Sequence, residues 1–146
     1  MLCRQAIDDA TLDLLKQLQA VPEFMQLRLA GGTALALQRG HRKSIDLDLF
    51  GPLAADSITI SNRLARVGRI IELGGSMNIH VYSVNDIKVD IVNYPYPWLD
   101  DAVDIEGVRM AAVSDIAAMK LAAITNRGSK KDLVDICRLL QEFTLE

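Results

Sequence analysis

The stretch "GGTALALQRGHRKSIDLDLF" (residues 31–50) decides the fold, because it places a paired-glycine turn, a short helix and a strand in direct succession. The apolar run of residues 27–30 stops at Gly31 and Gly32, where the chain is predicted to turn. The segment "TALALQR" that follows favours a helix, and Gly40 is a natural C-terminal stop for it. We therefore expect a strand, a glycine turn and a short helix in this order.

The next strand carries two like charges close together. In "SIDLDLFG" the side chains are predicted to alternate between two faces, so that Asp46 and Asp48 share one of them. The opposite face takes the apolar residues Ile45, Leu47 and Leu49. Two neighbouring carboxylates are unfavourable unless a positive charge lies between them. Mg²⁺ prefers hard oxygen ligands and combines one or two carboxylates with substrate phosphates and water, so the pair predicts a Mg²⁺ site, with Mn²⁺ as the alternative ion.

A third aspartate, Asp90, lies in the middle of the apolar segment "IKVDIVNY". It is predicted on the face opposite to its neighbours Val89 and Ile91. If the two strands are adjacent, three carboxylates converge. They would hold the metal ions of phosphoryl transfer, or hold one ion while Asp90 accepts a proton from the attacking hydroxyl group. Upstream, backbone N–H groups at the paired glycines would approach a phosphate at the start of the helix.

Each of these features also has a purely structural interpretation. Paired glycines usually make only a turn, an aspartate pair on a strand often faces solvent on an exposed sheet, and Asp90 taken alone fits a surface position. The combination of the three in this order favours the phosphoryl-transfer site.

Composition sets the limits on the whole chain. It has 146 residues, of which 50% are hydrophobic and 24% are charged, with a net charge of -3. These values predict one soluble globular domain that spans residues 1–146 and is cytoplasmic, without a membrane segment. The two cysteines, Cys3 and Cys137, lie far apart and support neither a disulfide framework nor a zinc site. The net charge does not favour bulk capture of nucleic acid, although a local basic patch would still serve that purpose.

Periodicity and turn residues predict the remaining elements. A first helix ends at Pro22, a second is capped by Ser or Asp and ends at Gly68, and a tight turn at Asn85-Asp86 joins two strands. Everything after Pro97 is expected to be helical. The predicted strands after Gly68 are residues 69–77, 78–84 and 87–94, and the C-terminal helices cover about 114–146, with Ser114 as the first cap. This order predicts a single mixed sheet with helices packed on it, of the α/β or α+β class.

Two segments carry a resemblance to a known family. "GGTALALQRGHRKSIDLDLF" and the later "MKLAAITNRGSKKDLVDICRLL" resemble the two signatures of the AbiEii/AbiGii toxin family of nucleotidyltransferases. The match covers about residues 27–50 and 115–140, and the segment between them is supported by pattern alone. The resemblance implies a polymerase-beta-like minimal nucleotidyltransferase fold. Ile45 stands where the related antitoxin-type enzymes carry Asp, and "GHRKS" favours the toxin-like branch.

The resemblance also implies roles for individual residues. Asp46 and Asp48 would bind Mg²⁺, and Lys120 would neutralise the triphosphate. The residue pattern adds Asp90 as a third metal ligand and places Arg127 seven residues after Lys120, nearly above it on the same helix. The phosphate-binding turn would be Gly31, Gly32 and Thr33, and the catalytic group would be Asp46, Asp48, Asp90, Lys120 and Asp132. The alternatives stay open: Lys120 and Arg127 would only extend to solvent from a core-facing helix, Asp132 would only cap the last helix, and Asp135 would be a surface acid.

Two further clusters allow two interpretations each. The loop "HRK" (residues 41–43) would contact a nucleotide or an RNA backbone, but clustered charge in a loop is more often solvated. Tyr94, Tyr96 and Trp98 follow Asp90 and would stack on a base or cover an edge of the core.

The activity implied is the transfer of a nucleoside monophosphate from an NTP to a hydroxyl acceptor, with release of pyrophosphate. Family membership implies a toxin whose partners are a cognate antitoxin protein and an RNA acceptor such as the 3′ end of tRNA. Family members carry more helical sequence after the last motif, so the resemblance implies the chemistry more directly than the acceptor. Two rival hypotheses are a degenerate, non-catalytic member that binds nucleotide or a partner protein, and an interaction domain without phosphate chemistry.

Overall fold

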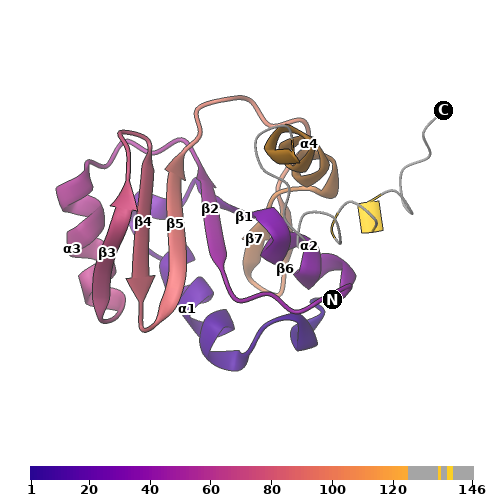
Figure 1. Cartoon of the computed structure of the whole chain (residues 1–146), viewed down its shortest axis with the longest axis horizontal. Coiled ribbons are helices and arrows are strands. Elements are labelled where there is room, and N and C mark those ends of the chain that lie inside the picture. Colours follow the sequence, from indigo (N-terminus) through magenta and orange to yellow (C-terminus); the bar gives the residue numbers. More distant parts are fainter. Residues whose placement is uncertain (125–134, 136–137, 140–146) are drawn as a thin grey trace.

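The computed structural model describes residues 1–124, 135, 138 and 139. Its centre is a seven-stranded mixed sheet with the strand order β3-β4-β5-β2-β1-β7-β6 (Figure 1). The strands are β1 (Arg28–Ala30), β2 (Leu47–Gly51), β3 (Ile70–Gly75), β4 (Ile79–Val84), β5 (Ile87–Asn93), β6 (Val103–Ile105) and β7 (Val108–Met110). The expected single mixed sheet is confirmed.

The four α-helices of the described residues are α1 (Asp9–Gln19), α2 (Gly31–Arg39), α3 (Ser57–Val67) and α4 (Val113–Ile124). Short 3-10 turns, η1 (Arg4–Ala6) and η2 (Pro22–Phe24), flank α1. The N-terminal caps of α1 and α3 are aspartates, since Asp8 accepts a hydrogen bond from the backbone N–H of Thr11 and Asp56 accepts one from Thr59. None of the helices in the described part of the chain has the length and hydropathy needed to cross a bilayer.

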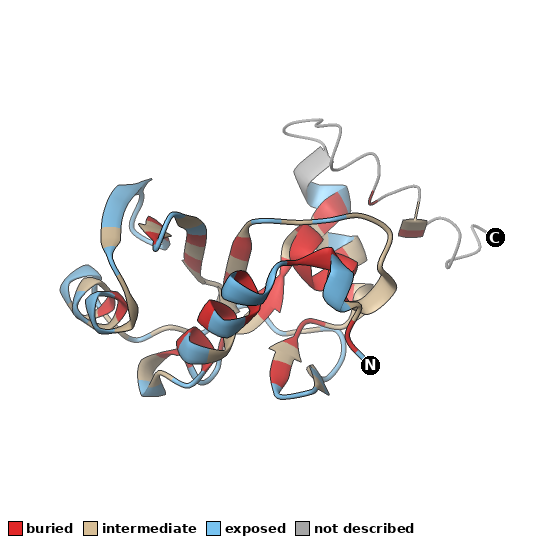
Figure 2. Ribbon diagram, turned by 90° about the horizontal axis from the view of Figure 1, so that it is seen from below, coloured by how far each residue is buried: buried red, intermediate tan, exposed pale blue. Residues whose placement is uncertain are grey.

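Strand pairing assigns each face of the sheet. β2 runs parallel to β5 and antiparallel to β1, and β4 runs antiparallel to β5. On β2 and β5 the residues Leu47, Leu49, Val89 and Ile91 are fully buried and belong to the core, together with residues of α1 and α3. Buried positions concentrate in the middle of the molecule, whereas β3 at the edge is largely exposed (Figure 2). The opposite face carries Asp48 and Phe50 on β2 and Lys88, Asp90 and Val92 on β5.

Three expectations about the elements are wrong. Residues 103–110 form the β6–β7 hairpin rather than helix, with its turn at Glu106 and Gly107, both of which have positive φ. β2 begins at Leu47, so Asp46 precedes the strand, and Ile45 is 67% exposed rather than in the core. Ser114 lies inside α4 instead of capping it, and its hydroxyl hydrogen bonds to the Asp100 carboxylate.

Candidate active site

Asp48 and Asp90 lie side by side on the polar face of the sheet. They are direct partners in the register of the parallel strands β2 and β5, although 41 residues separate them in the sequence. Asp46 immediately precedes β2, and its charge acts on both other carboxylates. The structure therefore places Asp48 and Asp90 next to each other, with Asp46 near enough for its charge to act on both.

The carboxylates destabilise one another's charged forms. Burial, together with the charges of Asp90 and Asp46, raises the pKa of Asp48 to about 7, against the opposing effects of Lys88 and Lys120. The pKa of Asp90 is also raised, first by burial and then by Asp46, while Lys88 lowers it. Lys88 was not predicted, although its spacing of two residues from Asp90 on one strand places both side chains on the same face. The cluster holds more negative charge than its own cations offset.

These side chains fit a divalent cation bound together with a substrate. The Oδ1 atom of Asp90 is buried without a hydrogen-bond partner and lies 3.7 Å from Nζ of Lys88. Within the described residues, no group of three or more His, Cys, Asp or Glu side chains would hold a metal ion by itself. Mg²⁺ needs only one or two carboxylates when phosphates and water complete its ligands. Asp48 and Asp90 are the residues that would hold it, with Asp46 beside them.

The glycine turn lies directly against Asp48. Gly31 begins α2 with a φ of +66°, and a Cβ atom at this position would lie 2.5 Å from Oδ2 of Asp48. A Cβ atom on Gly32 would lie 1.9 Å from a terminal nitrogen of Arg42. The first N–H groups of a helix have no intrahelical partner and carry the positive end of its dipole. The turn thus offers bare backbone donors beside the carboxylates.

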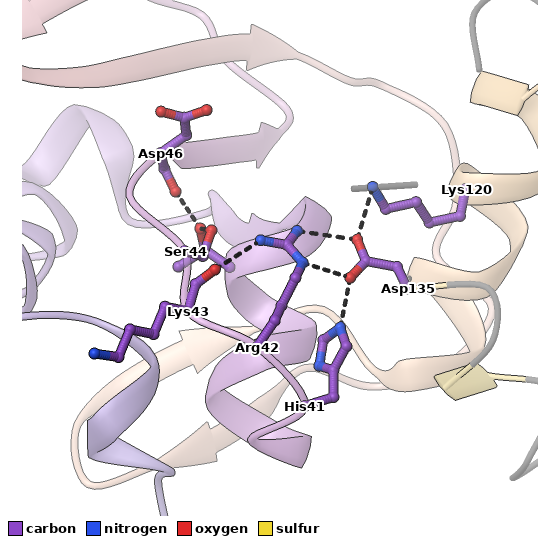
Figure 3. Close-up of polar contacts among 8 residues, drawn as sticks. His41, Arg42, Lys43, Ser44, Asp46, Lys120 and Asp135 are labelled. Atoms are coloured by element: carbon purple, nitrogen blue, oxygen red, sulfur yellow. Dashed lines mark hydrogen bonds and ion pairs between the residues drawn. The ribbon is translucent and has the colours of Figure 1, made fainter. Parts of the chain in front are cut away.

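A buried carboxylate gathers three basic side chains behind this turn. Asp135 is fully buried, and its oxygens lie 2.8 Å from Nε of Arg42, 2.5 Å from Nε2 of His41 and 3.0 Å from Nζ of Lys120 (Figure 3). The interpretation of Asp135 as a surface acid is therefore wrong. The interpretation of residues 41–43 as a solvated loop is wrong for His41 and Arg42, whose side chains are largely buried. The sequence signal was present, since Asp135 belongs to the "KDLVD" run of the second family signature.

The basic side chains around Asp135 stabilise its charged form. Burial acts to raise the pKa of Asp135, but hydrogen bonds from Arg42, His41 and Lys120 outweigh it and lower the pKa to about 2. The Asp135 carboxylate forms ion pairs with both Arg42 and Lys120. Lys120 is itself buried and also lines the cleft that contains Asp48. Lys120 thus lies between the buried Asp135 carboxylate and the cleft beside Asp48.

A cleft of about 680 Å³ joins the glycine turn to Asp48 and Lys120. Its volume lies within the range typical of small-molecule sites. Gly31, Gly32, Asp48 and Lys120 line one part, and the remainder is largely apolar. Its other lining residues are Phe50, Ile79, Tyr94, Pro97, Leu99, Asp115, Ile116, Ala118, Met119 and Ala122.

The remaining predicted residues have different positions. The hydroxyl of Thr33 is buried and bonds to Oγ of Ser44, at 2.5 Å, and to the backbone carbonyl of Asp46. Its side chain thus holds the loop before β2, and only its backbone N–H remains for a phosphate. Arg127 and Asp132 lie outside the described residues.

Comparison with known proteins places this geometry in a family. The family described as "Nucleotidyl transferase AbiEii toxin, Type IV TA system" matches residues 13–146. The chain is 37% identical over 118 residues to the uncharacterized protein aq_aa25 of Aquifex aeolicus. The matched region covers 78% of this chain and 57% of that protein. The chain thus spans little more than half of this curated relative.

Solved structures share the fold. A Helicobacter pylori protein assigned as a nucleotidyltransferase matches with a TM-score of 0.64 at 23% identity, over 93% of this chain and 70% of the other. ANT(2")-Ia, in a complex with adenylyl-2"-tobramycin, matches with a TM-score of 0.54 at 20% identity, over 92% of both chains. The predicted polymerase-beta-like nucleotidyltransferase fold is confirmed. The chain belongs to the AbiEii family of toxin nucleotidyltransferases from type IV toxin–antitoxin systems.

Proposed function

We propose that this protein is a Mg²⁺-dependent nucleotidyltransferase that transfers a nucleoside monophosphate from an NTP to a hydroxyl acceptor. The observation that carries the proposal is the contact between the glycine turn and Asp48, with Asp90 as the register partner of Asp48. The start of α2 and Asp48 line one cleft, and Asp90 lies next to Asp48, which supports a phosphate site beside a metal-binding carboxylate pair. We treat residues 1–146 as one nucleotidyltransferase domain.

In the proposed reaction, each group of site residues has its own role. The backbone N–H groups at Gly31, Gly32 and Thr33 would bind the β- and γ-phosphates, and Lys120 would offset their charge, with Arg127 as a further cation. The acceptor oxygen forms a bond to the α-phosphorus while the bond from that phosphorus to the bridging oxygen breaks, and pyrophosphate leaves. Asp90 would accept the proton of the attacking hydroxyl group, and Asp132 would be a further positioning acid. Mg²⁺, held by Asp48 and Asp90 with Asp46 beside them, would offset charge on the reacting oxygens.

The partners follow from the family. A type IV toxin has a cognate antitoxin, so we propose an antitoxin protein as the regulatory partner and RNA, such as the 3′ end of tRNA, as the acceptor. Because ANT(2")-Ia holds adenylyl-2"-tobramycin, a small-molecule acceptor is the second class to test.

Label transfer tests the proposal. The protein is incubated with Mg²⁺, each NTP labelled at the α-phosphate, and either total RNA or tobramycin. We expect label in RNA and released pyrophosphate for the wild type, and no transfer for Asp48→Asn. Asp101→Asn is the matched control, because Asp101 is an exposed aspartate outside the cleft lining and should transfer label normally. Nucleotide binding without transfer to any acceptor would instead support a non-catalytic member of the family.

A further inference from the structure

We propose that the apolar side of the cleft is the binding site for the nucleobase of the donor NTP. This side, the apolar wall, consists of Phe50, Ile79, Tyr94, Pro97, Leu99 and Met119. The proposal rests on the proposed function and specifies how its donor substrate is held: the base stacks on the wall, and its size matters more than its hydrogen-bonding edge.

The sheet register positions the wall relative to the reacting phosphate. Phe50 follows Asp48 by two residues on β2, so the two side chains lie on the same face about 7 Å apart along the strand. Ile79 of β4 pairs with Val92, which in turn is the register partner of Phe50. The apolar wall therefore begins directly beside the carboxylate pair, on the same face of the sheet.

The wall and the phosphate cradle lie on opposite sides of the carboxylates. β1 runs antiparallel to β2 and pairs Ala30 with Asp48, so Gly31 continues from Asp48 toward the start of β2. Phe50 lies in the other direction, toward the end of β2. An NTP whose α-phosphate is at the carboxylates and whose outer phosphates are at the glycine turn would extend its nucleoside toward the wall.

The rings of the wall are held in place before any ligand binds. The ring centroids of Phe50 and Tyr94 are 5.8 Å apart, and those of Tyr94 and Trp98 are 5.1 Å apart. Asp115 on α4 accepts hydrogen bonds from the backbone N–H groups of Leu99, at 2.8 Å, and Asp100, at 3.2 Å. The loop that carries half of the wall is thereby fixed to α4, which lowers the entropy cost of binding.

The chemistry of the wall fits a base better than a charged or hydroxylated group. Leu99 is 67% exposed and Ile79 is 42% exposed, so the wall offers apolar surface to solvent. Its only polar side-chain atom is the hydroxyl of Tyr94. Every nucleobase has a π-face that stacks on an aromatic ring, whereas discrimination between bases needs paired donors and acceptors. We therefore expect purine NTPs to bind more tightly than pyrimidine NTPs, because their larger ring system covers more of the wall.

Ring substitutions with matched ligands test this proposal. Binding of ATP, CTP and inorganic tripolyphosphate, each with Mg²⁺, is measured by calorimetry for the full chain. Trp98 is the single tryptophan and contacts Tyr94, so its fluorescence gives a second readout. Phe50→Leu and Tyr94→Leu remove rings that line the cleft. Tyr96→Leu is the control, because Tyr96 contacts Tyr94 but does not line the cleft.

We expect Phe50→Leu and Tyr94→Leu to weaken ATP binding about fivefold or more and to reduce the preference for ATP over CTP. Tripolyphosphate should bind unchanged, which shows that each variant is folded and keeps its phosphate site. Three results would overturn the base site while the proposed function stands. The ring variants would bind ATP as tightly as Tyr96→Leu does, or they would lose tripolyphosphate binding to the same extent as ATP binding, or they would lose only the binding of the RNA acceptor. A wild type that binds neither ATP nor tripolyphosphate would overturn both.

Discussion

Asp135 shows how one side chain holds the basic half of the site. Its carboxylate is fully buried and bonds to Arg42, His41 and Lys120, which come from the loop after α2 and from α4. A buried ion pair contributes little when compared with an apolar replacement, but removing one partner leaves the others uncompensated. Asp135 is therefore a positioning residue whose loss should affect both stability and phosphate binding.

Replacing Asp135 should destabilise the protein in a pH-dependent way. Asp135→Asn leaves the buried Lys120 and the partly buried Arg42 without this carboxylate, which should cost about 3 kcal/mol at pH 6. The pKa of Asp135 is lowered in the folded state from its ordinary 3.8 to about 2, so its contribution is complete above about pH 4 and is lost as the pH falls toward 2. Urea unfolding at pH 6 and pH 3 should show a smaller difference from wild type at pH 3. An equal difference at both values would contradict this role.

Asp48 should show the opposite effect on stability. Asp48→Asn removes a buried charge that is repelled by Asp90 and Asp46, so the metal-free variant should unfold at a temperature higher than wild type by on the order of 5 °C. Added Mg²⁺ should stabilise the wild type more than the variant and reduce this gap. Thermal unfolding at pH 8 with EDTA and then with Mg²⁺ measures both effects. A variant that unfolds below the wild type in EDTA would show that the carboxylates do not repel each other.

At the scale of the element, the two ends of α2 have glycines with the same conformation and different surroundings. Gly31 at the start and Gly40 after the end both have a φ of +66°. A Cβ atom on Gly31 would displace the Asp48 carboxylate, whereas one on Gly40 would lie 3.1 Å from Sγ of Cys3. Comparing substitutions at Gly31 and Gly40 therefore distinguishes the effect of backbone strain from the effect of displacing Asp48.

Alanine substitutions at these positions make the comparison. Gly31→Ala and Gly40→Ala should each lose about 1–2 kcal/mol from the strained backbone, with a further loss for Gly31→Ala from the contact with Asp48. Only Gly31→Ala should lose nucleotidyl transfer by a hundredfold or more, since it moves a proposed metal ligand. Urea unfolding and label transfer measure the two effects. Equal residual activity in both variants would show that the glycine turn does not belong to the active site.

At the scale of the whole molecule, the N-terminal residues tie the site to a distant hairpin. The backbone N–H of Leu2 donates to Glu106 in the β6–β7 turn at 2.7 Å. The backbone carbonyl of Ala6 accepts a hydrogen bond from Ser44 at 2.7 Å. Leu2 and Ala6 are buried in the core, so this segment fastens the loop that carries Arg42 and Asp46.

Deleting residues 2–5 should therefore weaken the site without removing any residue that lines it. We expect a lower melting temperature, faster hydrogen exchange at the Ser44 amide and weaker tripolyphosphate binding. Arg4→Gln is the control, because Arg4 is more than half exposed and solvent screens its ion pair with Glu106, so its loss should change stability little. Unchanged exchange at Ser44 in the deletion variant would show that the loop is held by other contacts.

Local features of the fold follow from the sequence because they depend on neighbours in the chain. The glycine turn, the C-terminal stop at Gly40 and the alternation of Leu47, Asp48 and Leu49 were all predicted. The turn at Asn85 and Asp86 was predicted too, and both residues have the positive φ of a tight hairpin turn. The β6–β7 hairpin was missed because its strands have only three residues each, too few for a periodic pattern.

The sequence by itself determined the chemistry of the site, since it places a carboxylate pair after a glycine turn and a third aspartate on a later strand. Only the tertiary structure decided which charges meet. The sheet order sets β5 beside β2 and so puts Asp90 next to Asp48, and packing of α4 against α2 accompanies the contact of Asp135 with Arg42 and Lys120. Periodicity encodes the face on which a side chain lies, but strand neighbours and buried ion pairs depend on the free energy of packing the whole chain.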